Sequence, residues 1–271
     1  MGTSGNRHNG IYMDICGKGE PIVMIHGIIS DSTFFEGGVK YLADHYTVIT
    51  YDRRGYGKSN TAECPDYTVH AQAEELVSIL QAECREPAWI VGNSAGGLVA
   101  LEAALWHPEL IKGMILIEPS LGYEPEERKK LLDWNKELNE YLEAGKIKRA
   151  LPAFSRVIGS SKSNDNSITL EEMKKTYQNL QAFMFGELNE IQHYLPPIEQ
   201  LRQLEMPVTI AVTEEGRESI FATSSLTAAE MIGWPVAWFP GNHNVAKEMP
   251  EEFSESVHRL LREMDKQTCN E

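Results

Sequence analysis

One short glycine-rich stretch constrains the fold of this chain more than any other. Residues 92–97 read Gly-Asn-Ser-Ala-Gly-Gly and match the pattern G-x-S-x-G, with Ser94 at its centre. An apolar run at 88–91 precedes it and predicts a buried strand, and an Ala- and Leu-rich run at 98–106 predicts a helix that ends before Pro108. Strand, sharp turn and helix form the context in which such a serine serves as a nucleophile.

The geometry of this turn explains its residue types. The turn forces Ser94 into a strained backbone conformation that exposes its hydroxyl above the sheet. Gly92 and Gly96 lie two residues to either side, where a Cβ atom would crowd the strand against the helix. The helix directs its free N–H groups and its partial positive charge toward the site. The stretch therefore predicts a catalytic serine.

Apolar runs elsewhere in the chain predict an α/β protein. Helices are expected at 69–83 and 250–264 in addition to the one after Ser94. Because strands alternate with helices, we expect a mostly parallel sheet with helices on both faces, and ligands beyond the carboxyl ends of its strands. Further strands are expected at 10–16, at the edge of the sheet, and at 21–25, 46–51, 111–117, 208–213 and 236–239.

The pattern changes between the strands at 111–117 and 208–213, where no strand is predicted. We predict that 123–204 is a helical cap or lid over the site, which sets specificity. The core domain then comprises 1–122 and 205–271. Amphipathic helices are expected within the cap at 125–144, 147–158, 170–186 and 188–203, with a polar loop at 160–167.

Charge and composition restrict the classes of partner. The chain has 271 residues, and its 40 Asp and Glu against 25 Lys and Arg give a net charge of −15. Such a charge repels nucleic acid phosphates and anionic membranes. The polar residues 1–9 lack a signal region, and no apolar run reaches the length of a membrane span. We expect a cytoplasmic protein that acts on a small-molecule substrate and binds neither nucleic acid nor membrane; a homo-oligomer is allowed but not predicted.

Motifs for metals and cofactors do not occur in the sequence. The four cysteines, Cys16, Cys64, Cys84 and Cys269, have no C-x-x-C spacing and no histidines in a zinc pattern near them. No phosphate-binding loop, dinucleotide fingerprint or H-E-x-x-H motif is present. The sequence therefore predicts no metal and no cofactor.

Four motifs occur in order along the chain: His26-Gly27 after a strand, Asp52-Arg53-Arg54-Gly55-Tyr56-Gly57-Lys58-Ser59, the turn at Ser94, and Gly241-Asn242-His243 after the last strand. Together they resemble the α/β-hydrolase superfamily over nearly the whole chain. The resemblance implies an eight-stranded, mostly parallel sheet with a helical cap between strands six and seven. It also implies a catalytic triad in the chain order serine, acid, histidine.

The chemistry of acyl transfer assigns roles to these motifs. A serine is a weak nucleophile unless a neighbouring base activates it, and His243, on a loop at a strand end, has the best position among the eight histidines. The oxyanion formed by attack needs hydrogen-bond donors. The backbone N–H of Ala95 is one, and the resemblance points to Ile28 for the second. His26 is expected to shape this oxyanion loop.

The acid of the triad departs from the usual pattern. Many members of the superfamily carry it in a G-x-x-D pattern after strand seven, but here that segment reads Thr-Glu-Glu-Gly and ends at Gly216. Glu214 or Glu215 could reach the histidine with a longer side chain, or Glu118 could do so from the end of the 111–117 strand. We favour Glu118, because a strand end holds its side chain more rigidly than a polar loop. We predict a contact between Glu118 and a ring nitrogen of His243.

Two arginines precede the glycines of the second motif. An anion-binding role is conceivable for Arg53 and Arg54, but we expect them to form ion pairs with Asp52 that brace the loop. Gly55 and Gly57 are expected to be turn residues and not a phosphate cradle.

These observations favour a serine hydrolase that acts on a small ester or related acyl compound through an acyl-enzyme. Two alternatives within enzymes use the same triad: hydrolysis of a lactone or a carbon–carbon bond, and cofactor-free peroxidation. A third alternative is a non-catalytic protein of the same fold that binds a small ligand. The missing G-x-x-D acid is the one feature that favours this last alternative.

Overall fold

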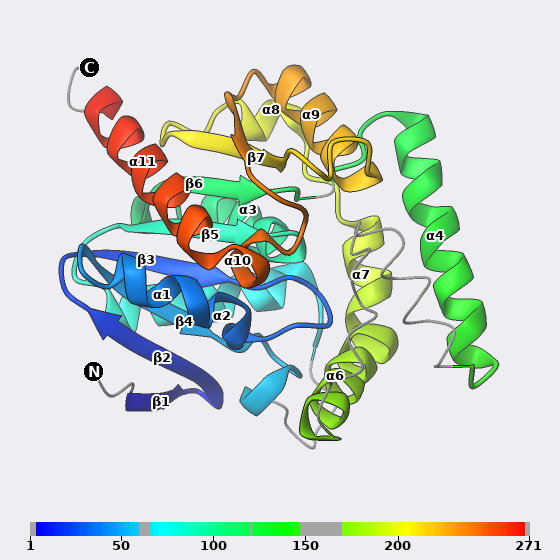
Figure 1. The fold of residues 1–271 in the computed structure, drawn as a ribbon. Helices are drawn as coiled ribbons and strands as arrows, with labels where there is room; N and C mark the ends of the chain where they lie inside the picture. Colours follow the sequence, from blue (N-terminus) through cyan, green and yellow to red (C-terminus); the bar gives the residue numbers. More distant parts are fainter. Residues whose placement is uncertain (1–3, 60–65, 120, 147–169, 269–271) are drawn as a thin grey trace.

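The computed structural model describes residues 4–59, 66–119, 121–146 and 170–268. Eight strands form one sheet in the order β1-β2-β4-β3-β5-β6-β7-β8 (Figure 1). The pairs β1–β2 and β2–β4 are antiparallel and all other neighbours are parallel, which confirms the predicted mostly parallel sheet. The strands are β1 (Ser4–His8), β2 (Ile11–Gly17), β3 (Glu20–Ile25), β4 (Tyr46–Tyr51), β5 (Ala88–Asn93), β6 (Ile111–Ile117), β7 (Val208–Thr213) and β8 (Val236–Phe239).

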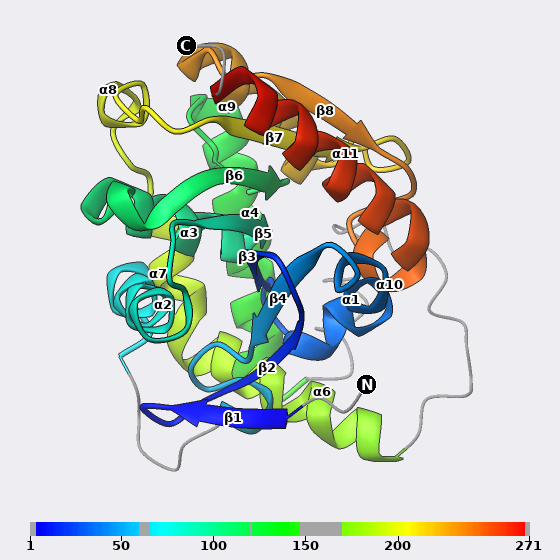
Figure 2. The same ribbon diagram turned by 90° about the vertical axis from the view of Figure 1, so that its left-hand side faces the viewer.

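Helices cover both faces of the sheet, as Figure 2 shows. One face carries α1 (Glu36–Leu42), α10 (Val245–Glu248) and α11 (Pro250–Thr268). The other carries α2 (Val69–Glu83), α3 (Ala95–Trp106), α8 (Ile198–Leu201) and α9 (Ile220–Ile232). Short 3-10 helices lie at Ser32–Phe35, Gly57–Ser59 and Pro108–Leu110.

The central strands are mostly apolar because they are buried on both faces. In β3, Ile22 and Met24 pack into the hydrophobic core beneath α1 and α11, whereas Val23 and Ile25 pack into the core beneath α2 and α3. Successive side chains of a strand point to opposite faces, so one apolar run contributes to two cores. This packing positions the carboxyl ends of β5 and β6.

The amino-terminal residues form a strand that the sequence analysis did not predict. β1 pairs with β2 through a turn at Asn9 and Gly10, whose φ angles are 48° and 86°. Asn-Gly with two positive φ angles is the preferred two-residue hairpin turn, so the sequence contained a signal for this hairpin. The expectation that residues 10–16 form the edge strand is therefore wrong, because β1 occupies that edge.

In its described part the segment between β6 and β7 contains helices but no strand. Figure 1 shows α4 (Pro125–Glu143), α6 (Leu170–Ala182) and α7 (Leu188–His193) beyond the carboxyl ends of the parallel strands. The helix expected at 188–203 is interrupted, because Pro196 and Pro197 separate α7 from α8. The helix expected at 147–158 and the loop at 160–167 lie outside the described residues. A π-helical turn, η4 (Phe183–Glu187), joins α6 to α7.

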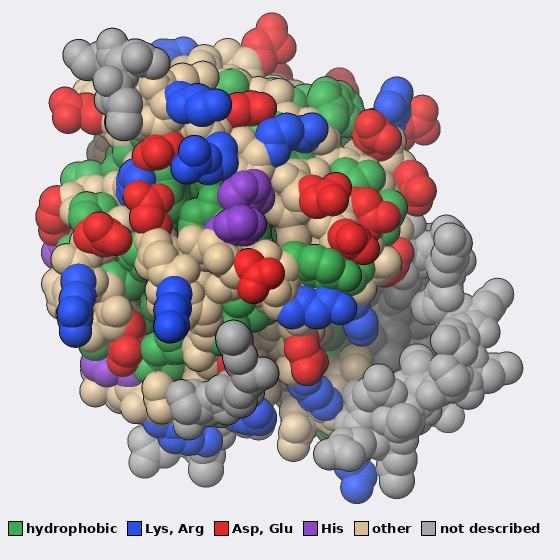
Figure 3. Space-filling view, turned by 60° about the vertical axis from the view of Figure 1, so that its left-hand side comes forward, with side chains coloured by type: hydrophobic (Ala, Val, Ile, Leu, Met, Phe, Trp, Pro, Cys, Tyr) green, Lys and Arg blue, Asp and Glu red, His purple; other side chains and the backbone are tan. Residues whose placement is uncertain are grey.

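Charged side chains of both signs cover the surface. On the face in Figure 3, Lys and Arg side chains are interspersed with Asp and Glu side chains, and the described residues shown there form no broad basic area. Among the helices of the described part, none combines the length and apolar character needed to cross a bilayer.

Candidate active site

Ser94 lies at a strained turn between β5 and α3. Its backbone has φ 52° and ψ −121°, a region that residues other than glycine rarely adopt. A Cβ on Gly92 would lie 2.7 Å from the Cα of Gly97, and a Cβ on Gly96 would lie 2.2 Å from the carbonyl oxygen of Ile25. Both positions therefore require glycine for the reason that the sequence predicts, and the side chain of Ser94 is held at the carboxyl end of β5.

Glu118 and His243 form a buried hydrogen-bonded pair. Nδ1 of His243 contacts Oε2 of Glu118, and both side chains are almost fully buried. This confirms the predicted contact. Oε1 accepts hydrogen bonds from the backbone N–H and the hydroxyl of Thr213, at 2.9 and 2.6 Å. Burial alone would raise the pKa of Glu118, but the hydrogen bonds and the proximity of His243 lower it below its ordinary value.

The structure explains why glycine occupies the usual position of the acid. A Cβ on Gly216 would lie 2.5 Å from Oγ1 of Thr213 and 3.4 Å from Oε1 of Glu118. The Glu118 carboxylate and its hydroxyl partner thus fill the space that an acid at this position would need. Glu214 and Glu215 are exposed, and neither makes the contact with His243.

Aromatic packing orients His243 beside the cavity that contains Ser94. The ring of Phe221 stacks on the imidazole with centroids 5.0 Å apart, and Trp134 of α4 meets Phe221 edge-on at 5.7 Å. Phe221, Trp134 and Ser94 line the same cavity. Within the described residues no hydrogen bond joins Ser94 to His243; such bonds in active sites often shorten only when substrate binds.

The cavity beside Ser94 has a volume of about 40 Å³. Ile28 and Ala95, the predicted oxyanion donors, both line it. Ala95 is the first residue of α3, so its N–H has no acceptor within the helix. Residues of α4 and α7 complete the wall, so these helices lie over Ser94.

Buried hydrogen bonds fix the loop that carries Ile28. The N–H of Arg53 donates to Nε2 of His26 at 2.9 Å, which leaves the proton on Nδ1, and Nδ1 donates to the carbonyl oxygen of Gly27 at 2.7 Å. Burial, reinforced by the charge of Arg53, lowers the pKa of His26 to about 3. A Cβ on Gly27 would lie 3.1 Å from the Cβ of Ser94, so this loop runs directly past the serine. His26 thus occupies the loop-shaping position that was expected.

Arg53 connects this loop to the helices over the site. Its guanidinium donates to the carbonyl oxygens of His26 and Gly27, each at 2.9 Å, and forms an ion pair with Glu187 of η4. Arg53 and Glu187 are both fully buried. Glu187 also accepts hydrogen bonds from Tyr56 and from Gln72.

The expected ion pairs between Asp52 and the arginines are absent from the described structure. The Asp52 carboxylate instead accepts hydrogen bonds from the backbone N–H groups of Ser32 and Lys58, at 2.8 and 2.7 Å. Arg54 pairs with Glu75 at 2.6 Å. The prediction is wrong because backbone donors of the loop satisfy Asp52, which frees the arginines for more distant acids.

Glu187→Gln is expected to destabilise the protein by about 3–5 kcal/mol, because it leaves the charge of Arg53 buried without a counter-charge. The substitution preserves the shape of the side chain, so lost packing contributes little. Urea unfolding at neutral pH measures the difference in the free energy of unfolding.

Glu199→Gln provides the matched control, because it makes the same chemical change in the pair of Glu199 with Arg202, whose side chains are 77% and 47% exposed. Its expected cost is below about 1 kcal/mol, as for other solvent-exposed pairs. Equal effects of the two substitutions would contradict the special importance of the buried pair.

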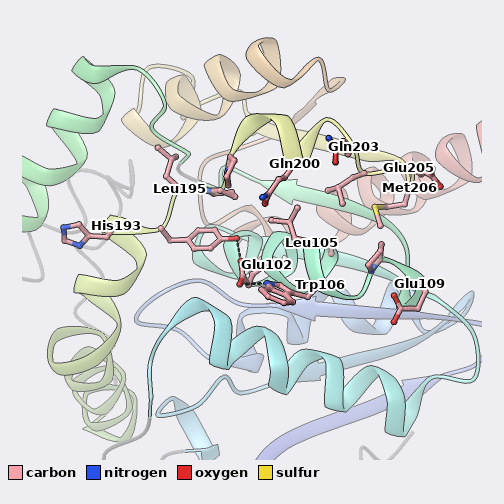
Figure 4. Close-up of a pocket in the computed structure, with 16 residues that line it drawn as sticks. Glu102, Leu105, Trp106, Glu109, His193, Leu195, Gln200, Gln203, Glu205 and Met206 are labelled. Carbon is pink, nitrogen blue, oxygen red and sulfur yellow. Dashed lines mark hydrogen bonds between the residues drawn. The ribbon is translucent and has the colours of Figure 1, made fainter.

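A larger groove lies away from Ser94. It has a volume of about 1050 Å³, and Figure 4 shows it between α3 and the segment that leads from α7 to β7. Glu102 crosses part of it, accepting hydrogen bonds from Trp106 at 3.0 Å and from Tyr194 at 2.8 Å. Neither Ser94 nor His243 lines this groove, so the volume of a groove does not by itself identify the active site.

In the described part of the chain, no group of three or more His, Cys, Asp or Glu side chains is arranged to bind a metal.

Comparisons with known proteins place these features in a wider context. A family model described as alpha/beta hydrolase fold matches residues 20–195. The uncharacterized hydrolase YraK of Bacillus subtilis is 28% identical over 266 residues, which cover 96% of this chain and 95% of YraK.

Solved structures give the same result for the fold. A thermophilic esterase from Thermogutta terrifontis has a TM-score of 0.73 at 19% identity, with 97% of both chains covered. A bromoperoxidase from Bacillus anthracis has a TM-score of 0.66 at 21% identity, with 93% of this chain and 95% of the other covered. At such identities the likeness shows a shared architecture.

Proposed function

The chain belongs to the α/β-hydrolase fold family, and from this premise we propose that it is a serine hydrolase of small esters that works through an acyl-enzyme. The observation that carries the proposal is the buried contact between Glu118 and Nδ1 of His243. A carboxylate at Nδ1 holds the proton on that nitrogen and leaves Nε2 unprotonated, as a general base requires.

The proposed reaction assigns one step to each group. Nε2 of His243 accepts the proton of Ser94 as the serine oxygen attacks the ester carbonyl, and Glu118 stabilises the imidazolium that forms. The backbone N–H groups of Ile28 and Ala95 stabilise the oxyanion. His243 then protonates the departing alcohol, and water hydrolyses the acyl-enzyme by the same sequence of proton transfers.

We propose that residues 123–204 form the cap and that 1–122 and 205–271 form the core. Support comes from the cavity beside Ser94, which α4 and α7 help to line. In this proposal the cap determines which acyl groups reach the serine.

The alternatives to ester hydrolysis differ in their support. The missing G-x-x-D acid favoured the non-catalytic alternative, whereas the contact between Glu118 and His243 supports a catalytic histidine. Lactone hydrolysis, carbon–carbon bond hydrolysis and peroxidation share the triad, and no contact in the described structure favours one of them over ester hydrolysis.

A fluorophosphonate probe tests the proposal, because it reacts rapidly only with an activated serine. We expect mass spectrometry to find the adduct on Ser94. His243→Ala is expected to slow labelling by about 10²–10⁴-fold, the usual contribution of a general base. His193→Ala, which changes an exposed histidine of α7, is the matched control and should be labelled at the wild-type rate. Equally fast labelling of the His243 variant would require another base.

A further inference from the structure

The cavity beside Ser94 is lined by a positively charged side chain that pairs with no acid among the described residues. Arg128 of α4 lines this cavity together with Ser94 and Ala95. Its guanidinium makes no ion pair or hydrogen bond with any described residue, although Glu124 lies only four residues earlier in the chain. Burial lowers the pKa of Arg128, and no acidic neighbour counteracts this effect.

A second polar group in the cavity also lacks a hydrogen-bond partner in the described part of the chain. Asn135 is only 4% exposed and lines the same cavity, and its buried carboxamide oxygen accepts no hydrogen bond. Leaving a buried acceptor unsatisfied costs about 1–3 kcal/mol. Arg128, Leu131 and Asn135 follow the i, i+3, i+7 spacing, so one face of α4 presents both groups to the site.

We propose that Arg128 binds a free carboxylate of the substrate, so that the preferred substrate is a small ester carrying a second, ionised carboxyl group. This inference rests on the proposed serine hydrolase function. A guanidinium can bind a carboxylate through two parallel N–H···O hydrogen bonds, which gives both affinity and orientation. The oxygen of Asn135 accepts a hydrogen bond from a hydroxyl or amide N–H of the same substrate.

The size of the cavity and the charge of the protein agree with this substrate class. A volume of about 40 Å³ corresponds to roughly three water-sized spaces, since one water needs about 10–15 Å³. A short chain with a terminal carboxylate suits this volume better than a long acyl chain. Because the net charge of −15 repels anions in general, capture of an anionic substrate needs a local cation.

The test compares two esters with the same leaving group, para-nitrophenyl butyrate and mono-para-nitrophenyl succinate. Their acyl chains have the same number of carbon atoms, but only the succinate ends in a carboxylate. We expect the wild-type protein to have the higher kcat/KM for the succinate. Arg128→Gln is expected to lower the ratio of the two kcat/KM values by about 10- to 100-fold, the usual effect of losing a charged hydrogen bond.

Two further variants make the comparison specific. Arg128→Lys keeps the charge without the planar fork, so it should retain part of the preference. Lys130→Gln removes the same charge from an exposed position on the same helix and should leave the ratio unchanged. An equal fall in the ratio for Lys130→Gln would show a general charge effect and would overturn the proposal.

A binding measurement separates this proposal from the hydrolase proposal. Calorimetry with Ser94→Ala should show that succinate binds, and that adding Arg128→Gln weakens its binding at least tenfold. Ester hydrolysis without any preference for the succinate would overturn the carboxylate site and leave the hydrolase intact. Arg128-dependent succinate binding without any hydrolysis would support the site and overturn the hydrolase. Tighter binding of inorganic phosphate than of succinate would also overturn the carboxylate site.

Discussion

Ser94→Ala is expected to lower the turnover of a reactive ester by on the order of 10⁶-fold, because the nucleophile and its covalent intermediate are lost together. The fold should persist. Alanine has the same backbone preferences as serine at φ 52°, and Ser94 makes no side-chain hydrogen bond that caps α3. Steady-state hydrolysis of a para-nitrophenyl ester measures the loss, and the thermal unfolding midpoint checks the fold.

Ser225→Ala is the matched control for this substitution. Ser225 is also a buried serine, and its hydroxyl has no hydrogen-bond partner among the described residues. The control should keep wild-type turnover and should react with the fluorophosphonate probe at the wild-type rate. Hydrolysis by the Ser94 variant at a rate comparable with that of wild type would show that the serine is not the nucleophile.

Local patterns predicted most of the sheet and the turn at Ser94. The strands at 46–51, 111–117, 208–213 and 236–239 have the predicted bounds, because each is a short apolar run between polar turns. The same holds for the helix at 69–83. The formation of these elements depends mainly on residues that are close together in the sequence, so they can be predicted from one sequence.

Contacts between distant residues were not predictable from the sequence. Arg53 and Glu187 lie 134 residues apart, and Glu187 resembles any other acidic residue of the helical segment. Arg128 and Asn135 share the charged and amphipathic pattern of α4, which gave no sign that both polar side chains face the site. Only the packing of the helices over Ser94 distinguishes these residues from solvent-exposed ones.

Glu118 is an intermediate case, because a local argument selected it from three candidates. Its position at the end of β6 suggested a rigid backbone, and the structure adds a positive φ of 45° and a hydrogen bond from its N–H to the carbonyl oxygen of Ala211 at 3.0 Å. The role of Thr213 as donor to the carboxylate was missed. The sequence signal for this role was the place of Thr213, three residues before Gly216.

Glu118→Gln is expected to lower kcat/KM by about 10⁴-fold without unfolding the protein. The glutamine amide can still accept hydrogen bonds from Thr213 through its oxygen, but it then presents an N–H₂ group to His243. Nδ1 of His243 must then become the acceptor, so the proton moves to Nε2. A base with a protonated Nε2 cannot accept the proton of Ser94.

The alternative acids supply matched controls for this prediction. Glu214→Gln and Glu215→Gln make the same chemical change at exposed positions after β7, and both should retain wild-type kcat/KM. A loss confined to the Glu118 variant would identify the acid that orients the base. If instead Glu214→Gln or Glu215→Gln caused the larger loss, the acid would be supplied from the loop after β7, and the buried contact of Glu118 with His243 would have only a structural role.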